Sequence, residues 1–356
     1  MFEKRALIIG ASGLVGQNLA RELLTEGDWS VFGVSRRPLV GYSEVQTVAV
    51  DLLDENATRA RLAAVEPTHV FVSAWMRMAT EVENVRVNGA LVRNVLEAVT
   101  ARSKSVRHVA LVTGTKHYLG PFEAYAKNKP ETPFREDQPR LSGENFYYTQ
   151  EDILFDFAAR HGFGFSVHRP HTIVGYAVGN LMNIGVTLAT WASICKATGR
   201  PLVFPGSPAQ FEGLTDVTDA RLLARHLSWA STTPSARNEA FNVVNGDVFR
   251  WKHLWPKIAR YFDVEPGTEP GEPLERQMAG ESTDAIWERL VKEHGLQPNK
   301  LRHLASPWHT DADLGRPFET VNDMSKSRRF GFLEYQDSER SFIDLFDQLR
   351  RERIIP

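Results

Sequence analysis

Residues 6–16 read ALIIGASGLVG, and this stretch decides the fold. The apolar run Ala6–Ile9 has the composition of a short buried strand, and the residues after the last glycine have helical spacing. Between them, Gly10, Gly13 and Gly16 allow a tight turn, a close approach of the backbone to a pyrophosphate, and close packing of the helix on the sheet. Such glycine spacing also occurs at ordinary strand-to-helix turns, but here the strand and the helix are both present. The stretch therefore predicts a dinucleotide site, with the phosphates at the helix N-terminus.

The composition is that of a globular protein: 356 residues, 42% hydrophobic and 24% charged. Lysine and arginine total 42 against 44 acidic residues, so we expect a small-molecule partner and no nucleic acid, and a homodimer stays open. Cys195 is the single cysteine, which excludes an internal disulfide and suits a reducing compartment. We find neither a secretory leader nor a run long enough to span a bilayer, so we expect a cytoplasmic protein without membrane association.

The end of the second predicted strand, residues 30–35, bears on the choice of cofactor. The strand finishes at Ser35 and is followed by Arg36 and Arg37. An NAD site usually has an acidic residue here for the ribose 2′-hydroxyl, whereas an NADP site has a cation for the 2′-phosphate. The two arginines favour NADPH/NADP⁺, with two solvated arginines at a strand end as the alternative.

Further strands alternate with helices along the first half of the chain. A third strand is predicted to end at Asp51, whose carboxylate could reach the adenine amino group, with Leu52 against the ring. A fourth ends at Ser73 and Ala74 beside the cofactor, and a fifth covers residues 108–114. This alternation predicts an α/β fold with a Rossmann-like, doubly wound parallel sheet.

The glycine pattern, the strand order and the phrase VNGALVRNVLEAV at 87–99 resemble the extended short-chain dehydrogenase/reductases. That resemblance implies a Ser or Thr after the fifth strand and a Tyr-x-x-x-Lys motif on the next helix. The sequence has Gly114 at the first position, and Asp152 stands four residues after Tyr148. Two of the three expected catalytic residues are therefore replaced.

Four segments together resemble one branch, the progesterone 5β-reductase/iridoid synthase family, whose members reduce activated carbon–carbon double bonds. The segments are WMRMATEVEN at 75–84, TGTKHYLGP at 113–121, NFYYTQED at 145–152 and HRPHTIVG at 168–175. The resemblance assigns the role of the missing lysine to Lys116 and makes Tyr148 its partner. Tyr147 would project about a hundred degrees away on a helix, so only one tyrosine can face the nicotinamide, and the alignment favours Tyr148.

The implied reaction is NADPH-dependent reduction of the C=C bond of an enone or enal. Tyr148 would donate to the enolate oxygen, and Lys116 would supply a positive field for the developing charge. Three alternatives stay open: a carbonyl reductase, a sugar-nucleotide epimerase or dehydratase of the extended family, and a non-catalytic NADP-binding regulator. The incomplete proton relay counts against the first two, and the intact lysine motif counts against the third.

The remaining predictions concern the site and the domains. The predicted cofactor-binding residues are Gly10, Ser12, Gly13, Leu14, Val15, Gly16, Ser35, Arg36, Arg37, Asp51, Leu52, Ser73, Ala74, Thr113, Tyr148 and Ile173. The predicted substrate-binding residues are Trp75, Tyr118, Met182, Trp191 and Phe204, and no metal site is expected. We expect a Rossmann domain over 1–176, completed by about 211–249 and 315–335. A smaller, interleaved substrate-binding region would cover 177–210 and 250–314, with a C-terminal helix at 336–356.

Overall fold

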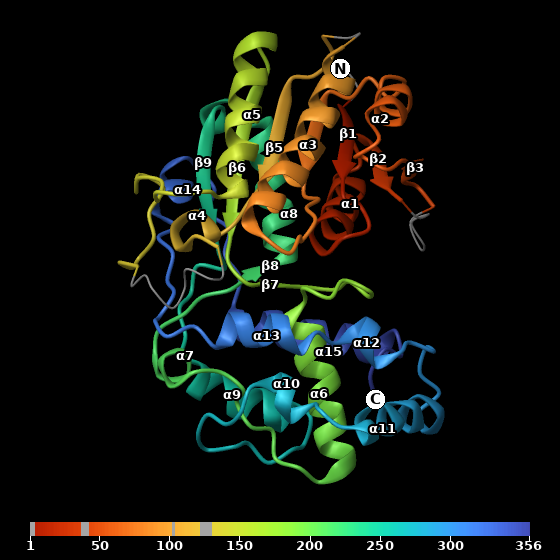
Figure 1. Cartoon of the computed structure of the whole chain (residues 1–356), viewed down its shortest axis with the longest axis vertical. Helices are drawn as coiled ribbons and strands as arrows, with labels where there is room; N and C mark the ends of the chain where they lie inside the picture. Colours follow the sequence, from red (N-terminus) through yellow and green to blue (C-terminus); the bar gives the residue numbers. More distant parts are fainter. Residues whose placement is uncertain (1–3, 37–42, 102–103, 122–129) are drawn as a thin grey trace.

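The computed structural model describes residues 4–36, 43–101, 104–121 and 130–356, which form an upper lobe around a sheet and a lower helical lobe (Figure 1). The N-terminus belongs to the upper lobe and the C-terminus to the lower one. Within the described residues, no helix is long and apolar enough to cross a membrane.

The sheet of the upper lobe has seven parallel strands among the described residues, in the order β3-β2-β1-β4-β5-β6-β9. Their bounds are β1 Lys4–Ile9, β2 Trp29–Ser35, β3 Gln46–Ala49, β4 His69–Val72, β5 His108–Val112, β6 Gly164–Pro170 and β9 Glu239–Val243. The predicted doubly wound parallel sheet is confirmed. One strand edge was wrong, because β3 leaves the ladder after Ala49 and does not reach Asp51.

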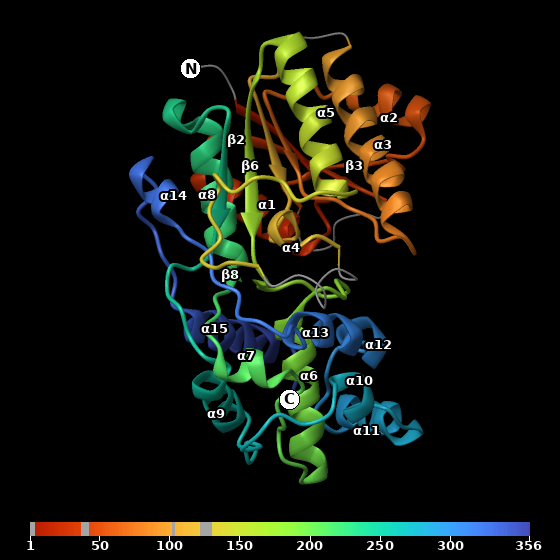
Figure 2. The same cartoon turned by 60° about the vertical axis from the view of Figure 1, so that its left-hand side comes forward.

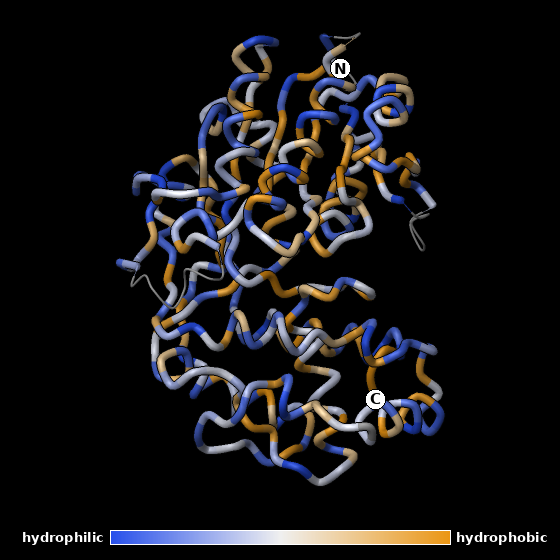
Figure 3. The backbone as a smooth tube through the Cα atoms, viewed as in Figure 1, coloured by the Kyte–Doolittle hydropathy of each residue, from blue (hydrophilic) through white to orange (hydrophobic). Residues whose placement is uncertain are grey.

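Helices cover both faces of this sheet (Figure 2). They are α1 Leu14–Glu26 and α8 Ala220–Thr232 on one face, and α2 Glu55–Leu62, α3 Glu81–Thr100 and α5 Phe146–His161 on the other. The alternation of side chains along a strand explains the two layers. In β1, Ala6 and Ile8 pack with α1 and α8, whereas Leu7 and Ile9 pack on the α3 and α5 side. Figure 3 shows the hydrophobic runs along these central strands.

The lower lobe is built from helices that follow the sheet in the sequence. They are α6 Ile184–Thr198, α7 Pro208–Glu212, α9 Trp251–Tyr261, α10 Leu274–Gln277, α11 Glu281–Glu293, α12 Leu301–Leu304, α13 Pro307–Leu314 and α15 Ser338–Arg351. Three short elements, α4 Lys116–Leu119, β7 Ile173–Val174 and β8 Thr218–Asp219, lie near the junction of the lobes. Two others belong to the upper lobe: the 3₁₀ turn Pro234–Ala236 follows α8, and α14 Ser325–Arg329 lies beside β9. One hydrophobic core joins α6, α9, α11 and α15, so the C-terminal helix packs with this lobe. The packing agrees with the predicted interleaving, whose boundaries stay a prediction.

Candidate active site

A cleft of about 400 Å³ lies where the two lobes meet, at the carboxyl edge of the sheet. Its upper wall follows the ends of β1, β2, β4 and β5, and its lower wall includes residues of α13. Ligands of doubly wound sheets bind at this edge, outside the carboxyl ends of the strands. The fold therefore places the cleft where the sequence predicts a dinucleotide.

The glycine turn forms one end of the cleft. Gly10 has φ of 89°, and a Cβ there would lie 2.9 Å from the Cβ of Ala74, so the turn needs glycine at this position. A Cβ on Gly16 would lie 2.3 Å from the carbonyl oxygen of Gly10, so this glycine lets α1 pack onto the turn and does not itself line the cleft. The first N–H groups of α1 have no intrahelical acceptor and are suited to a phosphate.

Most of the predicted cofactor residues line the cleft. They are Gly10, Ser12, Gly13, Leu14, Val15, Ser35, Arg36, Asp51, Leu52, Ser73, Ala74, Thr113 and Ile173. The exposed side chain of Arg36 follows β2 at one end of the cleft, while Arg37 lies outside the described residues. Asp51 accepts a hydrogen bond from the N–H of Leu53 (3.1 Å), and Asn94 donates to the carbonyl of Leu52 (2.9 Å), so this turn is held from two sides.

The two adjacent tyrosines of α5 point in different directions, and the sequence-based choice between them was wrong. Tyr147 lines the cleft, whereas Tyr148 does not. The hydroxyl of Tyr148 donates to the carbonyl of His117 (2.5 Å) and accepts from the N–H of Leu141 (3.0 Å). A tyrosine hydroxyl has one proton, and the carbonyl of His117 can only accept. The proton of Tyr148 is therefore committed inside the protein, away from the cleft.

Tyr147 and Lys116 both line the cleft, together with Gly114. A Cβ on Gly114 would lie 3.3 Å from the hydroxyl oxygen of Tyr147 and 3.2 Å from the carbonyl of Pro170. The glycine therefore leaves room for the Tyr147 hydroxyl where the resemblance implies a Ser or Thr. The ammonium of Lys116 lies 5.5 Å from the ring centroid of Trp75, which stacks on Phe146.

If Tyr147 is taken as the tyrosine of the Tyr-x-x-x-Lys motif, the lysine is expected four residues later, at position 151. That residue is Glu151, so Asp152 is not at the lysine position. Glu151 is buried, with its oxygens 2.8 Å from Arg140 and 3.3 Å from Arg169. Burial alone would raise the pKa of Glu151, but the neighbouring His117, Arg169 and Arg140 outweigh it and lower the pKa to about 2. The usual lysine is thus replaced by an ionised carboxylate inside an ion-pair cluster.

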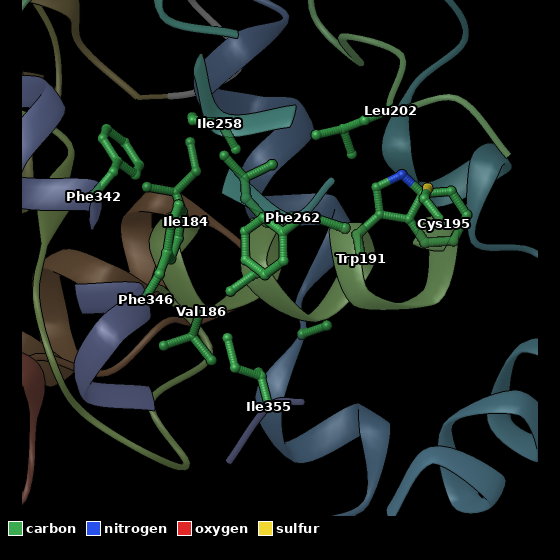
Figure 4. Close-up of a cluster of buried hydrophobic side chains, with 14 of the residues drawn as sticks. Ile184, Val186, Trp191, Cys195, Leu202, Ile258, Phe262, Phe342, Phe346 and Ile355 are labelled. Carbon is green, nitrogen blue, oxygen red and sulfur yellow. The ribbon is translucent and has the colours of Figure 1, made fainter. Parts of the chain in front are cut away.

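The predicted substrate residues divide into two groups. Trp75 and Met182 line the cleft. The other three predictions, Tyr118, Trp191 and Phe204, were wrong because each side chain is used in packing. Trp191 lies in the lower core with Cys195 and Leu202 (Figure 4).

Phe204 packs against Phe211, Trp251 and Trp255 in that same core. Tyr118 stacks on Phe134 and donates its hydroxyl to the side-chain oxygen of Asn242 (2.6 Å). Neither side chain lines the cleft.

The lower wall of the cleft carries polar residues that the sequence had not indicated. His309, Asp313 and Arg316 line it from α13 and the turn that follows. Arg316 is buried and donates to His171 (2.5 Å), which in turn contacts the buried Asp216 (2.7 Å), so this wall is anchored beneath the end of β6. The i, i+4 spacing of His309 and Asp313 indicates a shared helix face, but no local signal indicates that this face meets the sheet edge.

The Nε2 atom of His309 is buried and has no hydrogen-bond partner in the described part of the chain. Burial lowers the pKa of His309 to about 4, so the imidazole is neutral near pH 7. No group of three or more His, Cys, Asp or Glu side chains among the described residues is arranged to hold a metal ion.

The parallel sheet, the glycine turn and the cleft define a pyridine-nucleotide-dependent enzyme of the short-chain dehydrogenase/reductase type. Solved structures support the fold. A putative epimerase from Burkholderia cenocepacia superposes with a TM-score of 0.69 at 18% identity, over 98% of each chain. The Bordetella bronchiseptica enzyme WbmH, solved in complex with NAD⁺, gives a TM-score of 0.66 at 16% identity, over 98% of each chain.

Sequence relatives identify the family. A 3-oxo-Δ(4,5)-steroid 5-beta-reductase of Arabidopsis thaliana is 42% identical, and the (S)-8-oxocitronellyl enol synthase ISY1 of Nepeta racemosa is 40% identical. Each comparison covers the whole of this chain and 94% of the relative. The family model described as a PRISE-like Rossmann-fold domain matches residues 6–356, and the chain belongs to this family. The predicted family and the predicted oxidoreductase class are confirmed.

Proposed function

We propose that the protein uses NADPH to reduce the C=C bond of α,β-unsaturated carbonyl compounds. The observation that carries the proposal is the placement of Tyr147 and Lys116 in one cleft beside Gly114, with Glu151 at the position of the usual lysine. The names of the two relatives, a steroid 5-beta-reductase and an oxocitronellyl enol synthase, agree with it.

The cleft fits the dinucleotide. A Cβ at Gly10 would collide with Ala74, so the glycine turn keeps the backbone open to a pyrophosphate beside the N-terminus of α1. Arg36 lines the cleft close to the same turn, because Gly10 donates its N–H to the carbonyl of Val34 (3.2 Å) near the end of β2. Its guanidinium would pair with a 2′-phosphate through charge-assisted hydrogen bonds. Bound NADPH supplies the hydride for the β-carbon of the substrate. We therefore expect kcat/KM to be higher with NADPH than with NADH, and Arg36→Ala to remove most of the difference.

The residues of the chain then stabilise the charge that collects on the carbonyl oxygen. Tyr147 donates a hydrogen bond to this oxygen, and the ammonium of Lys116 adds a positive field. Both interactions become stronger as the enolate forms, so they lower the barrier more than they strengthen substrate binding. The polar groups His309 and Asp313 lie on the other wall and face the rest of the substrate.

The alternatives fit this geometry less well. A carbonyl reductase or an epimerase of the usual type needs a lysine near the tyrosine hydroxyl and a Ser or Thr beside it. Here the corresponding positions are an ionised Glu151 and Gly114, which removes the relay. A regulator without chemistry would have no use for a tyrosine and a lysine in the same cleft.

Isotope labelling tests the reaction. With deuterium-labelled NADPH and a simple enone such as cyclohexenone, we expect the label at the β-carbon of a saturated ketone. Label on the carbinol carbon of an allylic alcohol would show carbonyl reduction and refute the proposal. Tyr147→Phe should lower kcat about a hundredfold while the affinity for NADPH is retained.

We also propose a cytoplasmic location, on the sequence arguments given above, and a homodimer, which the balanced charge of the chain leaves open. Cys195 is buried, which agrees with a protein that keeps its thiol reduced. Cell fractionation and light scattering of the purified protein test the two proposals separately.

A further inference from the structure

The short helix α4 carries Lys116 into the cleft, yet it cannot hold its own geometry. It spans only Lys116–Leu119, and a single helical turn is not stable by itself because nucleation costs more than one hydrogen bond returns. The position of Lys116 must therefore be set by contacts from other elements. One contact comes from the end of β6, where the carbonyl of Pro170 accepts from the N–H of Thr115 (3.2 Å), and two come from the start of α5.

The N-cap residue of α5 and a side chain of its first turn bind consecutive carbonyls of α4. The Nδ2 of Asn145 donates to the carbonyl of Lys116 (2.8 Å), while its Oδ1 caps α5 by accepting from the N–H of Tyr147 (3.0 Å). The hydroxyl of Tyr148 donates to the carbonyl of His117 (2.5 Å). The helix that presents Tyr147 to the cleft is thus the helix that holds the backbone of Lys116.

The direction of the Tyr148 hydroxyl is fixed by its other contact. It accepts from the N–H of Leu141 (3.0 Å), so its one proton goes to the carbonyl of His117. The neighbouring Arg140 also contacts this tyrosine, with its guanidinium 4.8 Å from the Tyr148 ring centroid.

The same guanidinium is anchored to α5. It donates to Glu151 (2.8 Å) and to Asp152 (2.7 Å). The two acidic residues at and beside the position of the usual lysine therefore serve to hold this cluster together.

We propose that Tyr148 is a positioning residue, which acts through the backbone of α4 to keep Lys116 in place in the cleft with Tyr147. This inference rests on the proposed function, because it assumes that Lys116 contributes to turnover. It gives the second tyrosine of the motif a role distinct from that of the first: Tyr147 contacts the reacting oxygen, and Tyr148 fixes the cation that assists it.

A double-mutant cycle tests the inference. The turnover of cyclohexenone with NADPH is measured for the wild type, Tyr148→Phe, Lys116→Met and the double variant. Tyr148→Phe should lower kcat about tenfold, because one carbonyl contact of α4 is lost, and change the KM for NADPH less than about twofold. In the Lys116→Met background the same change should lower kcat less than about twofold, since there is no ammonium left to misplace.

A purely structural role of Tyr148 would not produce this coupling. If Tyr148→Phe lowers kcat by the same factor in the Lys116→Met background as in the wild type, the inference is overturned while the proposed function stands. If Lys116→Met keeps the wild-type kcat, Lys116 does not contribute to turnover and the inference is overturned as well. The labelling experiment decides the reaction separately. Tyr261→Phe is the matched control, because it loses a hydroxyl contact to Asp347 (2.7 Å) in the lower lobe and should keep wild-type kcat.

Discussion

Buried histidines should make the fold sensitive to mild acid. Beneath the sheet, the ring of His108 contacts the hydroxyl of Ser166 (2.8 Å), which also contacts His168 (2.8 Å). His168 lies 3.0 Å from His226, whose other nitrogen contacts Ser327 (3.0 Å). Burial lowers the pKa of His108 and that of His226 to about 3 each. The chain of rings is therefore neutral in the folded protein.

The loss of folding stability at low pH follows from these pKa values. A histidine of the unfolded chain has a pKa of about 6.5, so below that pH the unfolded state binds more protons than the folded state. The stability is present above about pH 6.5 and is lost as the pH falls toward the folded-state pKa of about 3. At about pH 5 each such histidine lowers the free energy of unfolding by about 2 kcal/mol, so His108 and His226 together lower it by about 4 kcal/mol. This is a large fraction of the stability of an ordinary domain.

Denaturant unfolding at about pH 7.5 and about pH 5, with His226→Gln beside the wild type, measures the effect. Replacement should reduce the loss of stability between the two pH values by about 2 kcal/mol, whatever it does to stability at neutral pH. His303→Gln, at an exposed position, is the control and should leave the pH dependence unchanged. Equal pH dependence in His226→Gln and the wild type would refute the reasoning, because all other groups are common to both.

Three further changes test the cleft and its support. Gly114→Ala would place a methyl 3.3 Å from the Tyr147 hydroxyl, so we expect kcat to fall about fivefold with a loss of stability of about 1 kcal/mol, measured by steady-state kinetics and thermal melting. Glu151→Gln should cost about 3 kcal/mol at neutral pH in denaturant titrations; because its folded pKa of about 2 lies below the unfolded value of about 4.3, the cost should shrink as the pH falls below about 4. His309→Phe should raise the KM of a hydroxylated enone about fivefold and leave that of its apolar analogue unchanged, which a matched substrate pair would show.

The residues of the upper wall of the cleft could be predicted from the sequence, because the motifs that place them are local. Gly16 is required by a contact within one turn, Gly10 is favoured locally by its φ of 89°, and Arg36 follows directly from the end of β2. Parallel strands bring their carboxyl ends to one edge, so residues after several strands could be assigned to one site without knowledge of distant contacts. Ser73 and Thr113, which are predicted to bind the cofactor, line the cleft for this reason.

The lower wall could not be predicted in the same way, because it depends on contacts between residues far apart in the sequence. His309 reaches the cleft because α13 is held by contacts with distant residues, among them the bond from Arg316 to His171, 145 positions earlier in the chain. Trp191 was predicted to contact the substrate but lies in the lower core. Helix α6 is buried along nearly its whole length, and a helix that is apolar on all sides belongs to a core, so this residue could have been excluded from the substrate site by that pattern alone.

The choice of tyrosine failed for a more specific reason, which also bears on the chemistry. Tyr147 and Tyr148 are almost equally buried, at 9% and 8% exposure, so neither hydropathy nor burial separates them. The alignment counted back from a lysine that is absent, and an error of one residue rotates the side chain by about a hundred degrees.

Counted from Tyr147, the residue at the lysine position is Glu151, which is held ionised between Arg140 and Arg169. A carboxylate there cannot supply the positive charge that assists proton transfer in a carbonyl reductase. Lys116 supplies the positive charge in the cleft instead, from the short helix α4, whose His117 carbonyl accepts from the Tyr148 hydroxyl. An arrangement that has lost the relay but keeps a donor and a cation can still stabilise an oxyanion, and an enolate needs nothing more from these groups.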